Sequence, residues 1–133
     1  MSNLPAVSAD GEGNGFAALQ AKLSVLQQAV GACVEHSQVV RLRMRNVSKA
    51  ADQLGDLSAA AEVAPPHLGA IRDISLDFAA SAGLASQLAG AFDRVHQAVA
   101  NAKAVHRAEY GGIRDAAASS RVSQAKPGFY RAT

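Results

Sequence analysis

Apolar residues recur at alternating spacings of three and four along the first half of the chain. The repeat occupies Phe16, Leu19, Leu23, Leu26, Val30, Cys33, Ser37, Val40, Met44, Val47, Ala51, Leu54, Ser58 and Ala61. A seven-residue repeat of this kind places an apolar stripe along one side of an α-helix, as in the seam of a coiled coil. It predicts one long helix from residue 16, and no other feature constrains the fold as strongly.

The segment Ala64 to His67 (APPH) ends this repeat, because proline lacks a backbone N–H and disfavours the helical conformation of the residue before it. One of the two prolines can occupy the first turn of a new helix. A second repeat follows at Ile71, Ile74, Phe78, Ser81, Ala85, Leu88, Phe92, Val95, Val99 and Ala102, and then, with poorer members, at His106, Glu109, Ile113 and Ala116. Two repeats of similar length predict an all-α fold, a long antiparallel helical hairpin with its turn near residues 63–67.

Two helices packed only on each other leave part of each apolar stripe uncovered. We therefore expect a partner, most simply a second hairpin that completes a four-helix bundle by dimerisation, although a short C-terminal helix could fold back instead. The residues expected in the assembly seam are Leu19, Leu23, Leu26, Val40, Met44, Leu54, Ile71, Ile74, Phe78, Leu88, Phe92 and Val95. Folding the chain about the prolines sets Arg41 level with Gly90 and brings His36 near His96.

The two ends of the chain differ from the hairpin in composition. Residues 1–15 are small and polar with several glycines, which predicts a flexible arm. The hairpin domain is expected to cover residues 16–123, with a break or kink at Gly111 and Gly112. Residues 124–133 are expected to form a C-terminal tail that ends in Phe129, Tyr130 and three further residues.

The sequence contains no membrane or export signal of the usual kind. No apolar run approaches the roughly 18 residues that span a membrane, and the first residues lack the basic-then-apolar order of a cleaved signal peptide. We expect synthesis in the cytoplasm and no transmembrane segment, while export without a cleaved leader stays open. The single cysteine, Cys33, excludes an intramolecular disulfide and is expected to act as a small hydrophobe.

The segment Val39 to Asn46 (VVRLRMRN) alternates apolar and cationic residues as a half-buried strand would. A helix nevertheless explains the spacing on both sides of it, with Arg41 and Arg43 flanking the seam and Leu42 facing solvent. Arg45 and Lys49 then lie about one turn apart near Arg41. This basic patch of Arg41, Arg43, Arg45 and Lys49 could bind phosphate, acidic lipid or an acidic partner, or could pair across the hairpin with acidic residues such as Asp93.

No set of residues with catalytic spacing is present. The four histidines (His36, His67, His96 and His106) lack the helical spacing and carboxylate partner of a metalloenzyme motif. There is also no glycine-rich phosphate loop, nucleophile elbow or paired-carboxylate site. We therefore expect a protein that is not an enzyme and that has no metal or cofactor.

Two long alanine-rich helices around a tight turn resemble the small helical-hairpin proteins of the tryptophan-variable-glycine (WXG) class. The turn carries HLG at residues 67–69, with histidine in place of the tryptophan. Tyr110 is followed four positions later by Arg114 and then by Asp115, where that class often has an acidic residue. Over roughly residues 16–115 the resemblance implies a hairpin that pairs as a four-helix bundle and is exported by actinobacterial type VII secretion.

The segment His106 to Arg131 looks like the C-terminal part of small accessory proteins from actinobacterial conjugative plasmids and integrative elements. Both families work alongside hexameric ATPases that pump DNA or protein. The two resemblances together imply a secretion or transfer ATPase as a partner.

The leading hypothesis is a non-enzymatic helical interaction protein, an adaptor, scaffold or cargo of a bacterial secretion or conjugative-transfer system. It would pair with itself or a similar chain, and would dock partners through Tyr110, Phe129, Tyr130 and the basic patch. The alternative is a DNA-binding accessory or regulatory protein of a mobile element that uses the basic helix face. Thirteen Lys and Arg against eleven Asp and Glu give a net charge of only +2, which is weak for a dedicated nucleic-acid binder.

Overall fold

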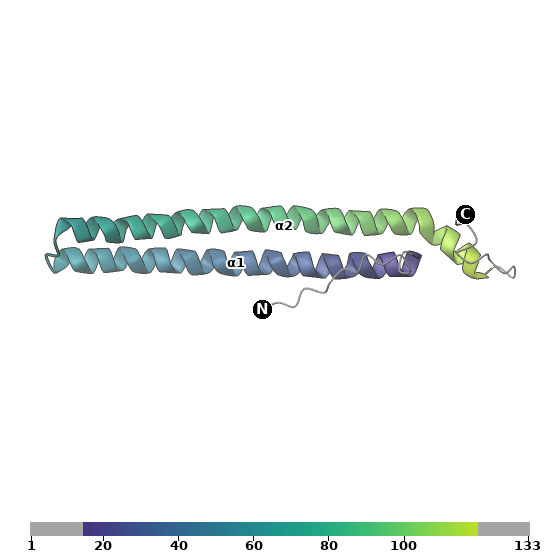
Figure 1. The fold of residues 1–133 in the computed structure, drawn as a ribbon, viewed down its shortest axis with the longest axis horizontal. Helices are drawn as coiled ribbons and strands as arrows, with labels where there is room; N and C mark the ends of the chain where they lie inside the picture. Colours follow the sequence, from purple (N-terminus) through teal and green to yellow (C-terminus); the bar gives the residue numbers. More distant parts are fainter. Residues whose placement is uncertain (1–14, 120–133) are drawn as a thin grey trace, which may run out of the picture. The chain divides into compact units, whose positions relative to one another are not determined.

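The computed structural model describes residues 15–119. They form two α-helices, α1 (Phe16–Ala60) and α2 (Pro65–Ser119) (Figure 1). The chain divides into two compact units. The first, the hairpin unit, is Gln27–Ala98, and the second, the terminal unit, combines Met1–Leu26 with Val99–Thr133. In each unit a segment of α1 packs against a segment of α2, so the predicted all-α helical hairpin is confirmed. The predicted arm up to residue 14 and the predicted tail at 124–133 lie outside the described residues.

The turn of the hairpin unit is a Schellman motif centred on Glu62. The backbone N–H of Val63 donates to the carbonyl of Ser58 at 3.0 Å, and that of Glu62 donates to the carbonyl of Ala59 at 3.1 Å. Glu62 has a φ of 58°, in the left-handed region that this motif requires and that glycine usually supplies. These bonds satisfy two of the carbonyls that a helix end leaves free. The motif ends α1 before the prolines are reached.

Pro65 and Pro66 belong to the first turn of α2, where their missing N–H groups cost nothing. The backbone N–H groups of His67 and Leu68 both donate to the carbonyl of Ala64, at 3.0 and 3.4 Å. The turn therefore spans residues 61–64 and lies earlier than the expected 63–67. This displaces the expected facing register by about one helical turn or more. Folding about the prolines would have set Ser48 opposite Gly83, whereas its hydroxyl bonds to Ser75.

Replacing Glu62 by glycine should raise the free energy of unfolding by about 0.5–1 kcal/mol, because glycine adopts a positive φ without the clash of a β-carbon. Urea denaturation of the two proteins measures the difference. Glu62→Ala is the matched control, since it removes the same charge but keeps the β-carbon. A glycine variant no more stable than the alanine variant would contradict the assignment of the left-handed cap.

The inner face of the hairpin unit is made of small residues. The buried side chains are Val30, Ser37 and Ser48 on α1, and Ser75, Ala82, Ala85 and Ala89 on α2. The Ser48 hydroxyl donates to the carbonyl of Ser75 at 3.0 Å. The Ser75 hydroxyl lies 3.1 Å from the carbonyl of Ser48 and 2.5 Å from Asp52 Oδ1, either of which can accept its proton. Small side chains let the two helices approach closely, and this buried polar pair has its hydrogen bonds satisfied.

One of the two rows of the predicted seam lies on the inner face, and the other does not. In the hairpin unit, Met44, Ile71, Phe78 and Phe92 are half-buried. Leu54, Ile74, Leu88 and Val95, which were also expected in the seam, are 47–54% exposed. The residue after each of them, Gly55, Ser75, Ala89 and His96, is more buried. The helices are thus rotated so that small and polar side chains meet, and the larger apolar ones lie beside the contact.

The terminal unit repeats this arrangement with a polar cluster. Gln20 is buried, and its side-chain Nε2 lies 3.1 Å from the carbonyl of Lys103 and 2.8 Å from His106 Nδ1. The ring of His106 stacks on Phe16 at a centroid distance of 4.9 Å. Of the residues expected in the seam here, Leu19 and Leu23 are half-buried while Leu26 is 38% exposed. Gln20, rather than Leu19, is the most deeply buried residue of its turn.

The expected break at Gly111 and Gly112 is absent, because α2 is continuous to Ser119. A β-carbon on Gly111 would lie 3.8 Å from Arg107 Cγ and 3.9 Å from the Phe16 ring, so the helix packs close to its neighbours there. Contact of this kind offsets the roughly 1 kcal/mol that glycine costs in a helix. The ribbon of α2 changes direction in its last turns (Figure 1).

Candidate functional site

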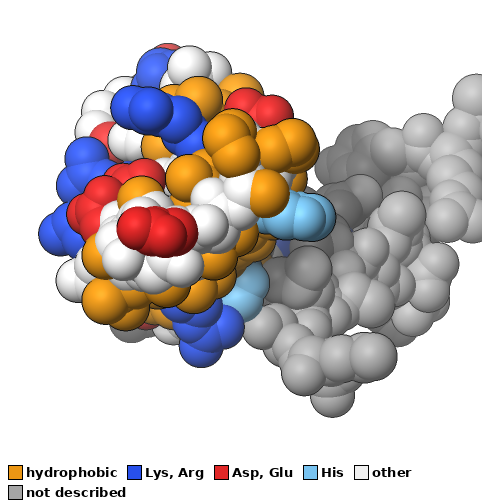
Figure 2. All heavy atoms as spheres, turned by 90° about the vertical axis from the view of Figure 1, so that its left-hand side faces the viewer, with side chains coloured by type: hydrophobic (Ala, Val, Ile, Leu, Met, Phe, Trp, Pro, Cys, Tyr) orange, Lys and Arg blue, Asp and Glu red, His pale blue; other side chains and the backbone are white. Residues whose placement is uncertain are grey.

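One face of the hairpin unit is apolar and open. We define the apolar flank as Val47, Leu54 and Leu57 on α1 with Ile74, Leu84, Leu88 and Val95 on α2; these side chains are 41–70% exposed. Val40, in the same row, is half-buried, and so is the free Cys33. Viewed from the turn, hydrophobic side chains gather at the upper right, while most acidic and basic ones collect on the left (Figure 2).

The two halves of the flank lie on the same side of the hairpin. On each helix the row lies one residue before the inner row, for example Leu54 before Gly55 and Ile74 before Ser75. Two antiparallel helices are related by a two-fold axis normal to their common plane, and this axis keeps equivalent positions on one face. The exposed apolar residues of α1 and α2 therefore form one surface and not two separate stripes.

Sequence reasoning missed two members of the flank, Leu57 and Leu84. A signal for Leu84 was present in the sequence as a second three-four repeat on α2. It runs through Ser81, Leu84, Leu88, Ala91, Val95, Ala98, Ala102 and Val105. A helix with two overlapping apolar repeats can pack against two neighbours at once. On α2 one of these repeats contacts α1, and the other is the flank.

The opposite face of the hairpin unit carries a shallow groove of about 720 Å³ with cations along one wall. Arg41, Arg45 and Lys49 of α1 line it, together with Ser48. The floor and far wall come from α2 and consist of Ala79, Ala82, Gly83, Ser86 and Gln87. We call this the cationic groove. Positions such as Arg45 lie about 160° around α1 from the flank row, at about 100° per residue, so the groove and the flank lie on opposite faces.

The predicted basic patch is therefore split. Arg41 is half-buried on the inner side, and its Nε is buried without a hydrogen-bond partner. Arg43 is exposed and does not line the groove, because two residues of helix turn it away from both Arg41 and Arg45. The expectation that Arg41 and Arg43 border the seam on its two sides is wrong for Arg41, which lies in the inner row itself. Leu42 is 52% exposed, as predicted.

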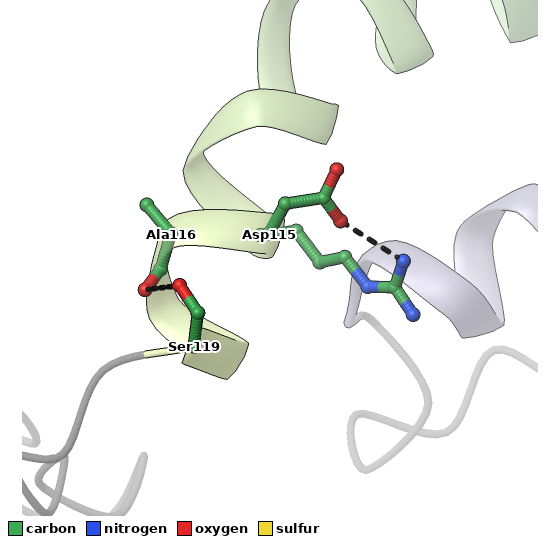
Figure 3. Close-up of polar contacts among 4 residues, drawn as sticks. Asp115, Ala116 and Ser119 are labelled. Atoms are coloured by element: carbon green, nitrogen blue, oxygen red, sulfur yellow. Dashed lines mark hydrogen bonds and ion pairs between the residues drawn. The ribbon is translucent and has the colours of Figure 1, made fainter.

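The cations of the groove have no acidic partners within residues 15–119. The one ion pair in this part of the chain joins Arg114 Nη1 to Asp115 Oδ1 at 3.2 Å, close to the bond from the Ser119 hydroxyl to the carbonyl of Ala116 (Figure 3). Asp93, the expected partner of the arginines, accepts a hydrogen bond from Gln97 Nε2 at 2.9 Å instead. The groove thus presents three positive charges to solvent.

The remaining candidate residues are dispersed. Tyr110 is 52% exposed in the terminal unit, with its ring tilted against His106 at 5.3 Å. Phe129 and Tyr130 lie outside the described residues. His96 lies against Gly31, more than one turn along α1 from His36. In the described chain no three His, Cys, Asp or Glu residues are placed to hold a metal ion.

Neither α1 nor α2 has an apolar stretch long enough to cross a membrane in its described residues. The fold and the two surfaces define a helical hairpin with exposed faces for other molecules. Comparison of the chain with protein-family models, curated proteins and solved structures finds no match.

Proposed function

We propose that this chain is a non-enzymatic helical interaction protein that pairs with a second helical hairpin through the apolar flank. The observation that carries the proposal is the mismatch between what the hairpin unit buries and what it leaves open. Its buried apolar side chains are one valine and three alanines, whereas the seven residues of the flank are all larger than alanine. A hairpin arranged in this way gains most of its apolar burial when the flank is covered.

The magnitude supports pairing. Full burial of a Val, Leu or Ile side chain contributes about 1.5–3 kcal/mol. Since the flank residues keep roughly half of their surface in water, covering them is worth on the order of 1 kcal/mol each, or about 7 kcal/mol per copy. A dimer with micromolar affinity needs about 8 kcal/mol net of the cost of association. Two flanks facing each other supply an amount of this order.

The simplest partner is a second copy of the chain, which gives a four-helix bundle. The biological setting we propose is a bacterial secretion or conjugative-transfer apparatus, in which the protein acts as adaptor, scaffold or cargo. Support for this setting comes from the resemblances at the HLG turn and in the segment from His106 to Arg131. Synthesis in the cytoplasm, followed where required by leaderless export, belongs to the same proposal.

Docking to a transfer or secretion ATPase is proposed to use Tyr110 with the tail residues Phe129 and Tyr130. Deleting residues 124–133 should leave the far-ultraviolet circular dichroism per helical residue unchanged and abolish capture of the purified ATPase on an affinity resin. Phe129→Ala with Tyr130→Ala is a smaller change that should weaken capture at least tenfold. Capture at the original level by both variants would refute a role for the tail.

The rival function is a DNA-binding accessory or regulatory protein of a mobile element. The observation that favours it is the unpaired row of Arg41, Arg45 and Lys49. Affinity for duplex DNA would then fall steeply as salt rises, because each neutralised phosphate releases counterions. Electrophoretic shift assays at 50 and 200 mM salt separate the two functions. Equal, negligible binding at both concentrations would remove this alternative.

A further inference from the structure

We propose that the cationic groove is a docking site for an acidic α-helix of a partner protein, on the face opposite the apolar flank. The site uses Arg41, Arg45 and Lys49 to pair with carboxylates and uses the small residues of α2 to seat the helix. This inference is independent of the proposed pairing, since it involves none of the flank residues.

The three cations have helical spacing. They occupy positions i, i+4 and i+8 of α1, so they follow one another at about 6 Å along the groove. Glutamates at i, i+4 and i+8 of a second helix share this spacing. Such a helix lying along the groove can present one carboxylate to each cation. Arginine adds geometric preference, because its planar fork pairs with a carboxylate through two parallel hydrogen bonds.

The opposite side of the groove is shaped for close approach. Ala79, Ala82, Gly83 and Ser86 project at most a methyl or hydroxymethyl group. A β-carbon built on Gly83 would meet nothing within 4 Å, so space is open above this residue. Helices pack at 8–10 Å between axes, and the shorter distances require small side chains at the contact. The combination of a cationic wall and a small-residue floor fits an amphipathic helix that is acidic on one side.

The same features disfavour nucleic acid as the occupant. Non-specific DNA binding rests on six to ten phosphate contacts at once in typical cases, and the groove offers three cations. Its lining contains no aromatic side chain on which a base could stack. A duplex about 20 Å wide cannot descend onto the floor between two packed helices, whereas a helix about 10 Å wide can.

Fluorescence anisotropy with the full chain and a labelled peptide tests this site. The probe is an 18-residue alanine-based helical peptide with glutamate at three positions spaced by four, and the matched peptide has glutamine at those positions. The glutamate peptide should bind at least tenfold more tightly. Arg41→Gln, Arg45→Gln and Lys49→Gln combined should reduce its affinity at least tenfold, while Arg43→Gln, off the groove, should change it less than twofold.

A second variant tests the floor without changing charge. Gly83→Leu should weaken the glutamate peptide at least fivefold, and Ser86→Leu replaces it if circular dichroism shows that the first variant does not fold. Leu54→Lys, on the flank, should leave peptide affinity within twofold even where it abolishes self-association. Unchanged peptide binding by the folded floor variant would overturn the site. So would equal binding of the glutamine peptide, or tighter binding of a 20-base-pair duplex that is lost in the triple variant.

Discussion

Replacing Leu54 and Leu88 together by lysine should convert the associated protein into a folded monomer. Both residues lie on the apolar flank and are about half exposed, at 54% and 50%, so the charged heads can stay in water in the separate hairpin. In the assembly the same lysines would be buried without partners, a cost of several kcal/mol for each site. We expect the dissociation constant to rise at least a hundredfold, measured by sedimentation velocity over a range of concentrations.

The control for this variant replaces Leu42 and Leu76 by lysine. These leucines are as exposed as the flank residues, at 52% and 61%, but lie on the outer sides of α1 and α2. The change in hydrophobicity and charge is identical, so any general effect on solubility or long-range repulsion is the same. If the control pair dissociates the protein as strongly as the flank pair, the flank is not the interface.

The largest effect on folding is expected from Ser75→Leu. Ser75 is only 4% exposed, and its carbonyl and hydroxyl both contact Ser48 across the inner face. Leucine would force the two helices apart, which costs about 1–3 kcal/mol for overpacking. It would also disturb the bonds of the buried Ser48 hydroxyl, which adds about 1–3 kcal/mol. A loss of about 2–5 kcal/mol in the free energy of unfolding should appear in urea denaturation.

Ser81→Leu is the matched control on the same helix. Ser81 is exposed, and its hydroxyl donates to the carbonyl of Asp77 one turn earlier at 2.9 Å. The residue lies in the flank row between Ile74 and Leu88, so leucine there should leave the hairpin intact and extend the apolar surface. If Ser75→Leu cost less than 1 kcal/mol, the close contact of small residues would not be what holds the hairpin unit together.

The sequence predicted the helices and their pairing because a seven-residue repeat and a proline pair are local signals. It did not predict the rotation of each helix. Leu54 and Gly55, or Leu88 and Ala89, are neighbours in a pattern that assigns the larger residue to the interior. In the structure the smaller residue is inside, because closer approach of two backbones recovers contact along the whole helix. That choice depends on both helices at once, and a single repeat does not encode it.

The position of the turn was misjudged for a related reason. Proline marks where a helix cannot continue, and it therefore drew the expected turn to residues 63–67. The helix ends instead at a left-handed glutamate, Glu62, a conformation for which the sequence carries no glycine signal. The shift of register then separated Arg41 from its expected level and split the basic patch. The cationic groove could be anticipated from neither helix alone, since its cations come from α1 and its floor from α2.

Sedimentation equilibrium of the unmodified chain tests the central claim most directly. The chain has a mass of 13.6 kDa. Covering the apolar flank with a second copy predicts a species of twice that mass that dissociates reversibly on dilution. A monodisperse 13.6 kDa species that keeps its mass at high concentration and melts cooperatively would contradict the account, because the hairpin would then be stable with its flank in water.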